Sequence, residues 1–192
     1  LREKSVSIRD KSRTARVLRD KITGLVELFN QARRYMQVKV TGPGLGLYPV
    51  DATVPLRTAM QTLAGQAEER GVNFVTRVPE VISLVNAPPQ ELGRLMHSLL
   101  QTLLNDAAEN TAIEVAVEER DHTVSYRLRN TGFGIPNEHF QDCLFGGEQI
   151  ITDEFKSLHD AIRCVSEWQG SVAANSEVGS GMSFDLELRT VI

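Results

Sequence analysis

A helical repeat of apolar positions dominates the first forty residues. From Ala15 onward the apolar residues lie three or four positions apart, at Ala15, Leu18, Ile22, Leu25, Phe29, Ala32 and Met36. This spacing places them along one face of an α-helix, and such a face calls for a partner helix that shields it from water. We therefore expect residues 1–40 to form a helical arm that makes a homodimer through Leu18, Ile22, Leu25, Phe29 and Met36.

The pattern changes after this arm. The glycine- and proline-rich run at 41–46 interrupts the helix, so residues 41–49 are expected to be a linker. In residues 50–192 helical and strand patterns alternate. Helices are predicted from Asp51 or Thr53 to Gly71, from Pro88-Pro89 through Leu103, and over about 153–168. Strands are predicted at 73–78, 81–85, 113–119 and 124–129 and on both sides of 179–181. Helices grouped on one face of a mixed sheet make an α+β fold, a two-layer sandwich.

Composition is that of a globular protein. The chain has 192 residues, of which 41% are hydrophobic, enough for one substantial domain and an extension. Nothing approaches 18 consecutive apolar residues, so we expect no membrane span, and the charged N-terminus does not resemble a signal peptide. Cys143 and Cys164 lack metal-ligand spacing, so we expect reduced thiols in a cytoplasmic protein without a metal site.

Charge is unevenly distributed along the chain. Residues 1–40 hold eleven Lys and Arg against four Asp and Glu, so they carry +7 and the remainder of the chain carries −11 of the total −4. A basic segment raises the question of nucleic acid. Here the charges are interleaved with the apolar stripe and few aromatic residues accompany them, so we expect no nucleic-acid partner.

A glycine turn follows the alternating strand that ends near Arg129. The segment Arg129-Asn130-Thr131-Gly132-Phe133-Gly134-Ile135-Pro136 could bring the backbone close to a ligand. It resembles the Asp-x-Gly-x-Gly-Ile-Pro motif of the ATP-binding domain of histidine kinases, in the GHKL superfamily. In that family the Asp accepts a hydrogen bond from the adenine amino group, and Asn130 stands at its position.

Two further segments resemble this family in the expected order. Residues 103–111 match Leu-Leu-Asp-Asn-Ala-x-Lys-Tyr-Thr in length. There the family's Asn holds Mg²⁺ and phosphate, whereas this chain has Asp106, with Asn105 in place of the family's Asp. Residues 179–188 are similar to Gly-x-Gly-Thr-x-Phe-x-Leu-x-Leu, with Met182 replacing Thr. The resemblance covers roughly 50–190 and implies a nucleotide-binding site, in degenerate form, at Asp106, Asn130, Gly132, Gly134, Gly179 and Gly181.

The second glycine box of the family is absent. Where the resemblance implies glycines whose N–H groups wrap the phosphates, the chain has the glycine-free segment 152–161, with acidic residues at Asp153, Glu154 and Asp160. We therefore expect a degenerate pocket with no resident cofactor, although weak binding of ATP and Mg²⁺ stays open. No catalytic residue is assigned.

Several of these residues also have a purely structural explanation. Asp106 could face solvent at the rim of its helix, Asn130 could form a turn, and Gly132 and Gly134 could preserve that turn without a ligand. His159 is expected on a helix surface. Trp168 is expected in the core or at a dimer contact.

The arm most resembles the second helix of the dimerisation hairpin of sensor kinases. The four histidines, His97, His122, His139 and His159, lie beyond residue 96, so none can be the phosphoacceptor on such a hairpin. The leading hypothesis is a two-component signalling protein, a histidine-kinase-like dimeric scaffold that is catalytically inactive as this chain. Its expected partners are a response-regulator receiver or another sensor kinase. The alternatives are a working or residual kinase whose phosphoacceptor helix lies elsewhere, and a histidine phosphotransferase-like protein.

Overall fold

The computed structural model describes residue 21 and residues 46–146 and 153–191. The chain divides into two units, Leu1–Gly46 and Leu47–Ile192. The predicted dimer contacts Leu18, Ile22, Leu25, Phe29 and Met36 lie outside the described residues.

A five-stranded mixed sheet forms one layer of this unit. Its strands are β2 (Asn73–Arg77), β4 (Ala112–Arg120), β5 (Thr123–Asn130), β7 (Gly181–Arg189) and β6 (Ser171–Glu177), in the spatial order β2-β4-β5-β7-β6. Only β2 and β4 are parallel, and the other neighbours are antiparallel. The remaining pair, β1 (Tyr48–Asp51) and β3 (Leu84–Ala87), forms a small separate sheet.

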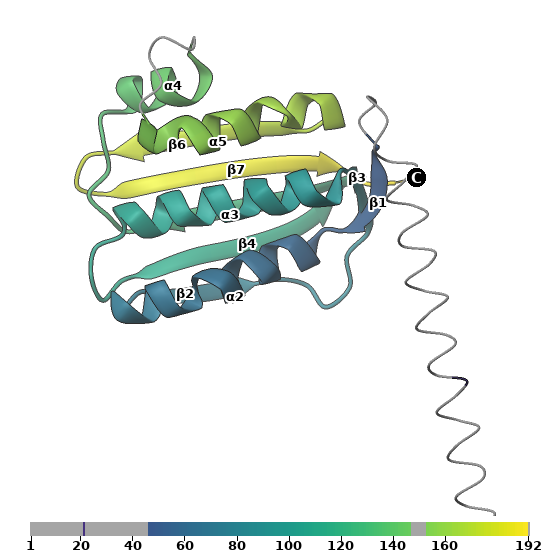
Figure 1. The fold of residues 1–192 in the computed structure, drawn as a ribbon, viewed down its shortest axis with the longest axis horizontal. Coiled ribbons are helices and arrows are strands. Elements are labelled where there is room, and N and C mark those ends of the chain that lie inside the picture. The colour runs from purple at the N-terminus through teal and green to yellow at the C-terminus, as the bar shows by residue number, and fades with distance from the viewer. Residues whose placement is uncertain (1–20, 22–45, 147–152, 192) are drawn as a thin grey trace, which may run out of the picture. The chain divides into compact units, whose positions relative to one another are not determined.

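Three helices form the other layer. Helices α2 (Thr53–Glu69), α3 (Pro89–Asp106) and α5 (Asp153–Arg163) lie side by side across one face of the sheet (Figure 1). Two short helices, α4 (Asn137–Phe145) and the 3₁₀ helix η1 (Val165–Trp168), complete the unit. The predicted α+β two-layer sandwich is therefore confirmed.

The core lies between the two layers, with α3 at its centre. Alternate residues of the central strands point toward the helices and are buried, as period-two alternation requires. The buried hydrophobic residues of β4, β5, β7 and α3 are Ile113, Val115, Val117, Val124, Tyr126, Leu128, Met182, Phe184, Leu186, Leu188, Leu92, Leu95, Met96, Leu99, Leu100, Leu103 and Leu104. Trp168 is also buried, as expected of a core residue. No helix of the described part of the chain is long and apolar enough to cross a membrane.

Most predicted elements occur where the pattern places them. The β4–β5 hairpin turns at Asp121 and His122, both with positive φ (48° and 63°). Two elements differ. The strand expected at 81–85 is β3 at Leu84–Ala87, and β1 lies partly inside the predicted linker. Both strands are four residues long and pair with one another across some thirty intervening residues, and Val85 of β3 also forms an isolated bridge with Thr190. Because these partners are distant in the chain, local sequence carries little signal for the two strands.

Candidate functional site

The C-terminal end of α3 carries Asp106. Arg70, just beyond the end of α2, donates from its guanidinium to the carbonyl oxygens of Leu104 (2.5 Å), Asn105 (3.3 Å) and Ala107 (3.4 Å). A cation that binds the last carbonyls of a helix satisfies unpaired acceptors and interacts favourably with the helix dipole. Arg70 therefore holds the end of α3 in place, a role that nothing in the local sequence predicts.

The carboxylate of Asp106 is engaged on both sides. Its Oδ1 accepts a hydrogen bond from the backbone N–H of Gly134 (2.8 Å), and its Oδ2 accepts one from the side-chain amide of Asn130 (2.9 Å). Only 9% of Asp106 is exposed. The alternative in which Asp106 faces solvent at a helix rim is therefore wrong, because the glycine turn folds over the end of α3.

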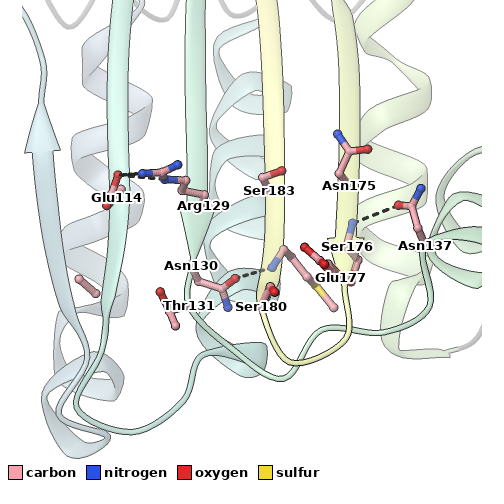
Figure 2. A pocket seen from close by; sticks show the side chains of 13 residues that line it. Glu114, Arg129, Asn130, Thr131, Asn137, Asn175, Ser176, Glu177, Ser180 and Ser183 are labelled. Carbon is pink, nitrogen blue, oxygen red and sulfur yellow. Dashed lines mark hydrogen bonds and ion pairs between the residues drawn. The ribbon is translucent and has the colours of Figure 1, made fainter.

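The amide of Asn130 makes three hydrogen bonds. Its Nδ2 donates to Asp106 and to the carbonyl oxygen of Leu103 (2.9 Å), and its Oδ1 accepts from the backbone N–H of Met182 (2.7 Å; Figure 2). These neighbours determine which end of the amide is nitrogen, since Met182 N–H can only donate and the Leu103 carbonyl can only accept. Both amide protons are thus used within the protein.

Three of the four predicted glycines, Gly132, Gly134 and Gly181, stand where a side chain would collide with neighbouring atoms. A Cβ on Gly132 would lie 2.3 Å from the carbonyl oxygen of Asp106, and one on Gly134 would lie 2.0 Å from that of Glu177. Gly181 has φ of +110°, and its Cβ would lie 2.7 Å from Oδ1 of Asn130. Gly179 has φ of +80° and open space around it, and its N–H donates to the carbonyl of Phe133 (2.6 Å). The structure therefore brings all six predicted site residues to one end of the sheet.

A small cavity of about 270 Å³ adjoins Asp106. Its lining is Thr102, Asn105, Asp106, Phe133, Ile135, His139, Phe155 and Met182. Drug-sized ligands are usually bound in pockets of about 300–1,000 Å³. The described lining contains no Lys or Arg, and four of its members are large apolar side chains. A polyphosphate would find neither Lys nor Arg among these described residues.

Residues 153–161 of the glycine-free segment lie in α5, at the start of the helix predicted over about 153–168. Residues 153–163 are helical, so the N–H groups beyond the first turn bond within the helix and are not free to wrap a ligand. His159, expected on the helix surface, is 4% exposed, and its Nδ1 donates to the carbonyl oxygen of Leu144 (3.0 Å). That expectation is wrong. Phe155, Leu158 and Ile162 share its helical face, and this spacing is the signal that could have placed it inside.

A second pocket, of about 590 Å³, lies on the face of the sheet that the helices leave uncovered. Glu114, Arg129, Ser183 and Asn175 form a row across β4, β5, β7 and β6 (Figure 2). Oε2 of Glu114 accepts a hydrogen bond from Nε of Arg129 (2.9 Å) and forms an ion pair with its Nη2 (2.8 Å), so the guanidinium is neutralised by its neighbour. Within the described part of the chain, no group of three or more His, Cys, Asp and Glu side chains could hold a metal ion.

Comparison with solved structures finds histidine kinases. The catalytic domain of histidine kinase ThkA superposes with a TM-score of 0.63 at 15% identity, over 75% of this chain and 95% of that one. Full-length ShkA in complex with AMPPNP superposes with a TM-score of 0.64 at 19% identity, over 98% of this chain and 41% of the ShkA chain. Histidine kinase ThkA in complex with the response regulator protein TrrA superposes with a TM-score of 0.64 at 14% identity, over 90% of this chain and 50% of the matched chain.

Sequence comparison adds no relative. No family model matches the chain, and no curated protein matches it. At these identities the likeness to the solved structures is a likeness of fold. The second unit of this chain has the fold of a histidine-kinase catalytic (ATPase) domain.

Proposed function

We propose that this chain is a two-component signalling protein, a dimeric histidine-kinase-like scaffold whose degenerate nucleotide pocket does not support phosphoryl transfer. The observation that carries the proposal is the bond from Asn130 to Asp106. The two side chains that the resemblance assigns to adenine and to metal and phosphate are bound to one another and to the backbone, so a ligand would have to displace these bonds.

The energetic argument rests on desolvation. Asn130 and Asp106 are 8% and 9% exposed, and each of their polar atoms has a partner at 2.7–2.9 Å. Breaking a buried hydrogen bond without replacing it costs about 1–3 kcal/mol, and bonds to charged groups lie at the upper end. Losing two such bonds would lower the affinity for a ligand by about a hundredfold or more.

The phosphate side of the site supports the same proposal. Phosphoryl transfer requires a γ-phosphate held by metal and hydrogen-bond donors in line with a nucleophile. Here α5 presents a continuous helix, the cavity beside Asp106 is small, and its described lining lacks Lys and Arg. Residues 1–96 contain no histidine to act as the acceptor.

The partners follow from the same proposal. The arm of residues 1–40 would hold two copies together, and the domain would act through contacts with a response-regulator receiver or another sensor kinase in the cytoplasm. One structural neighbour, ThkA, was solved in complex with a response regulator, which favours the receiver. The closing glycine turn is retained and favours the second candidate, a residual kinase with its phosphoacceptor helix elsewhere. A histidine phosphotransferase would need an imidazole on the arm.

Calorimetric titration of the full chain with Mg-ATP tests the proposal. We expect no saturable heat at millimolar nucleotide, and no acid-labile label from ATP radiolabelled at the γ-phosphate. The double variant Asn130→Asp with Asp106→Asn, which restores the family's residue at both positions, serves as the comparison. A micromolar dissociation constant for the unmodified chain would refute the degenerate pocket and favour the residual kinase. Label that disappears on replacing one of the four histidines would identify the acceptor.

A further inference from the structure

The two edge strands of the five-stranded sheet differ in how they are protected. On β6 the outward N–H of Ser176 donates to Oδ1 of Asn137 (3.1 Å; Figure 2), and the outward carbonyl of Ala174 accepts from Nε2 of Gln141. Asn137 and Gln141 lie one turn apart on α4, so their side chains occupy the place of a neighbouring strand. Natural sheets often cover their edges in this way because a bare edge recruits another strand.

The β2 edge has no such cover among the residues that the structure describes. The N–H of Asn73 donates to the carbonyl of Thr111 (3.1 Å), and β2 runs parallel to β4. In a parallel pair this directs the backbone groups of Asn73, Val75 and Arg77 toward β4 and those of Phe74 and Thr76 away from the sheet. No described residue bonds to the backbone of Phe74 or Thr76. Four of the five β2 residues are exposed, and 47% of Val75 is accessible.

We propose that the β2 edge pairs with the β2 edge of a second copy of this chain, in an antiparallel arrangement whose two-fold axis passes beside Val75. In this register Phe74 of each copy lies opposite Thr76 of the second copy. Their outward groups then exchange two hydrogen bonds at each of two residue pairs, as hydrogen-bonded pairs do in antiparallel sheets. Every unpaired group of the edge obtains a partner.

The side chains of β2 are self-complementary in the same register. Val75 meets Val75 of the second copy, and Arg77 lies opposite Asn73 of the second copy. The strand carries a single charge, Arg77, and the two-fold axis places no like charge opposite it. The pairing that satisfies the backbone therefore also satisfies the side chains, which is the property of an isologous interface.

This interface is independent of the proposed dimer contact on the arm. It is small, because it rests on five residues a side, so association is expected at high protein concentration rather than at trace levels. Two interfaces with separate two-fold axes would build assemblies larger than a dimer. The test therefore uses the full chain carrying Leu25→Asp and Phe29→Asp, which removes the arm contact. If the arm makes no dimer, these changes alter nothing and the β2 test is unaffected.

Sedimentation and hydrogen exchange measure the pairing in this background. We expect a concentration-dependent dimer and slower exchange of the Phe74 and Thr76 amides as concentration rises. Val75→Lys and Val75→Glu each place like charges on the two-fold axis and should raise the dissociation constant at least about tenfold. An equimolar mixture of the two variants should restore the dimer, because lysine then faces glutamate. Val81→Lys is the matched control, since Val81 is 89% exposed and lies outside β2.

Three results would overturn the proposal: exchange of the β2 amides that does not depend on concentration, an equal effect of Val81→Lys, or a mixture that stays monomeric. Exchange in the background protein needs no β2 variant, so it remains decisive even if a charge at Val75 impairs folding. Slowing of the β2 amides only after another protein is added would assign the edge to that protein and refute self-pairing.

Discussion

The side-chain amide of Asn130 donates a 2.9 Å hydrogen bond to the carboxylate of Asp106. The family that the sequence resembles has an aspartate at the position of Asn130 and an asparagine at the position of Asp106. The two residue types are therefore exchanged between two positions whose side chains are in contact. The pair retains one amide and one carboxylate. The two differences from the family, which lie far apart in the sequence, therefore concern a single pair of hydrogen-bonded side chains.

A double-mutant cycle on this pair should show strong coupling. Asn130→Asp alone places two carboxylates in contact, which favours protonation of one of them. Asp106→Asn alone places a second amide opposite the amide of Asn130. The orientation of the Asn130 amide is determined by its hydrogen bonds to Met182 and Leu103. Each single change is expected to lower the free energy of unfolding by about 1–3 kcal/mol. The double variant again has an amide facing a carboxylate. Its loss of unfolding free energy should therefore be at least about 1 kcal/mol smaller than the sum of the losses of the two single variants.

Denaturant unfolding of the four proteins measures this coupling. The carbonyl of Leu103 also accepts from the N–H of Ala107, so the double variant leaves no buried acceptor without a donor. Additive effects of the two single changes would contradict the direct bond, because side chains that do not interact give independent free energies.

Two glycine substitutions should separate steric from conformational demands. Gly179→Ala strains only a left-handed backbone with free space around it, a loss of about 1–2 kcal/mol. Gly134 has a similar left-handed backbone angle, and its replacement by Ala also brings the new Cβ into collision with the carbonyl of Glu177. Gly134→Ala should therefore lower the free energy of unfolding by about 1–3 kcal/mol more than Gly179→Ala does. Thermal denaturation of both variants checks the order. Equal losses would mean that the turn over Asp106 can move without strain.

Tyr126 should give the domain a specific sensitivity to alkali. Its hydroxyl donates to the carbonyl of Ala52 (2.7 Å), and burial, with the nearby charge of Asp51, raises the pKa of its phenol well above the ordinary value of 10.0. The folded state keeps this proton after the unfolded chain has lost it. Stability from this group is therefore complete below pH 10 and falls as the pH rises above it.

The variant Tyr126→Phe tests this dependence. It should lower the free energy of unfolding by about 0.5–1.5 kcal/mol at neutral pH and remove up to about 1.4 kcal/mol per pH unit of the alkaline slope. Tyr48→Phe is the control, because the Tyr48 hydroxyl makes no hydrogen bond with a described residue. Parallel curves for Tyr126→Phe and the unmodified chain above pH 10 would show that Tyr126 ionises freely in the folded state.

The arm should make the unmodified chain at least a dimer. The helical face predicted for Leu18, Ile22, Leu25, Phe29 and Met36 would expose several hundred Å² of apolar surface if left alone, and monomers rarely expose a patch of that size. Sedimentation should therefore show a smaller species when Leu25→Asp and Phe29→Asp are introduced together. A wild-type chain that is monomeric at high concentration would refute this assignment.

The order of helices and strands was accessible from the sequence because local rules govern it. Alternation in β4 and β5, the apolar face of α3, the Pro88-Pro89 helix start and the glycine turns each act within a few residues. The same short motifs carried the likeness to the histidine-kinase fold. Where an element depends on a distant partner, as β1 and β3 do, the local pattern failed or was displaced by three residues.

The chemical state of the site was decided by tertiary structure. Asp106 and Asn130 are separated by 23 residues along the chain, and only the packing of β5 against the end of α3 brings them into contact. His159 lies inside because α4 supplies the carbonyl of Leu144, and Arg70 reaches from the end of α2 to the end of the neighbouring helix α3. Hydrogen bonds need partners at about 3 Å, and such distances between remote residues exist only after the chain has folded.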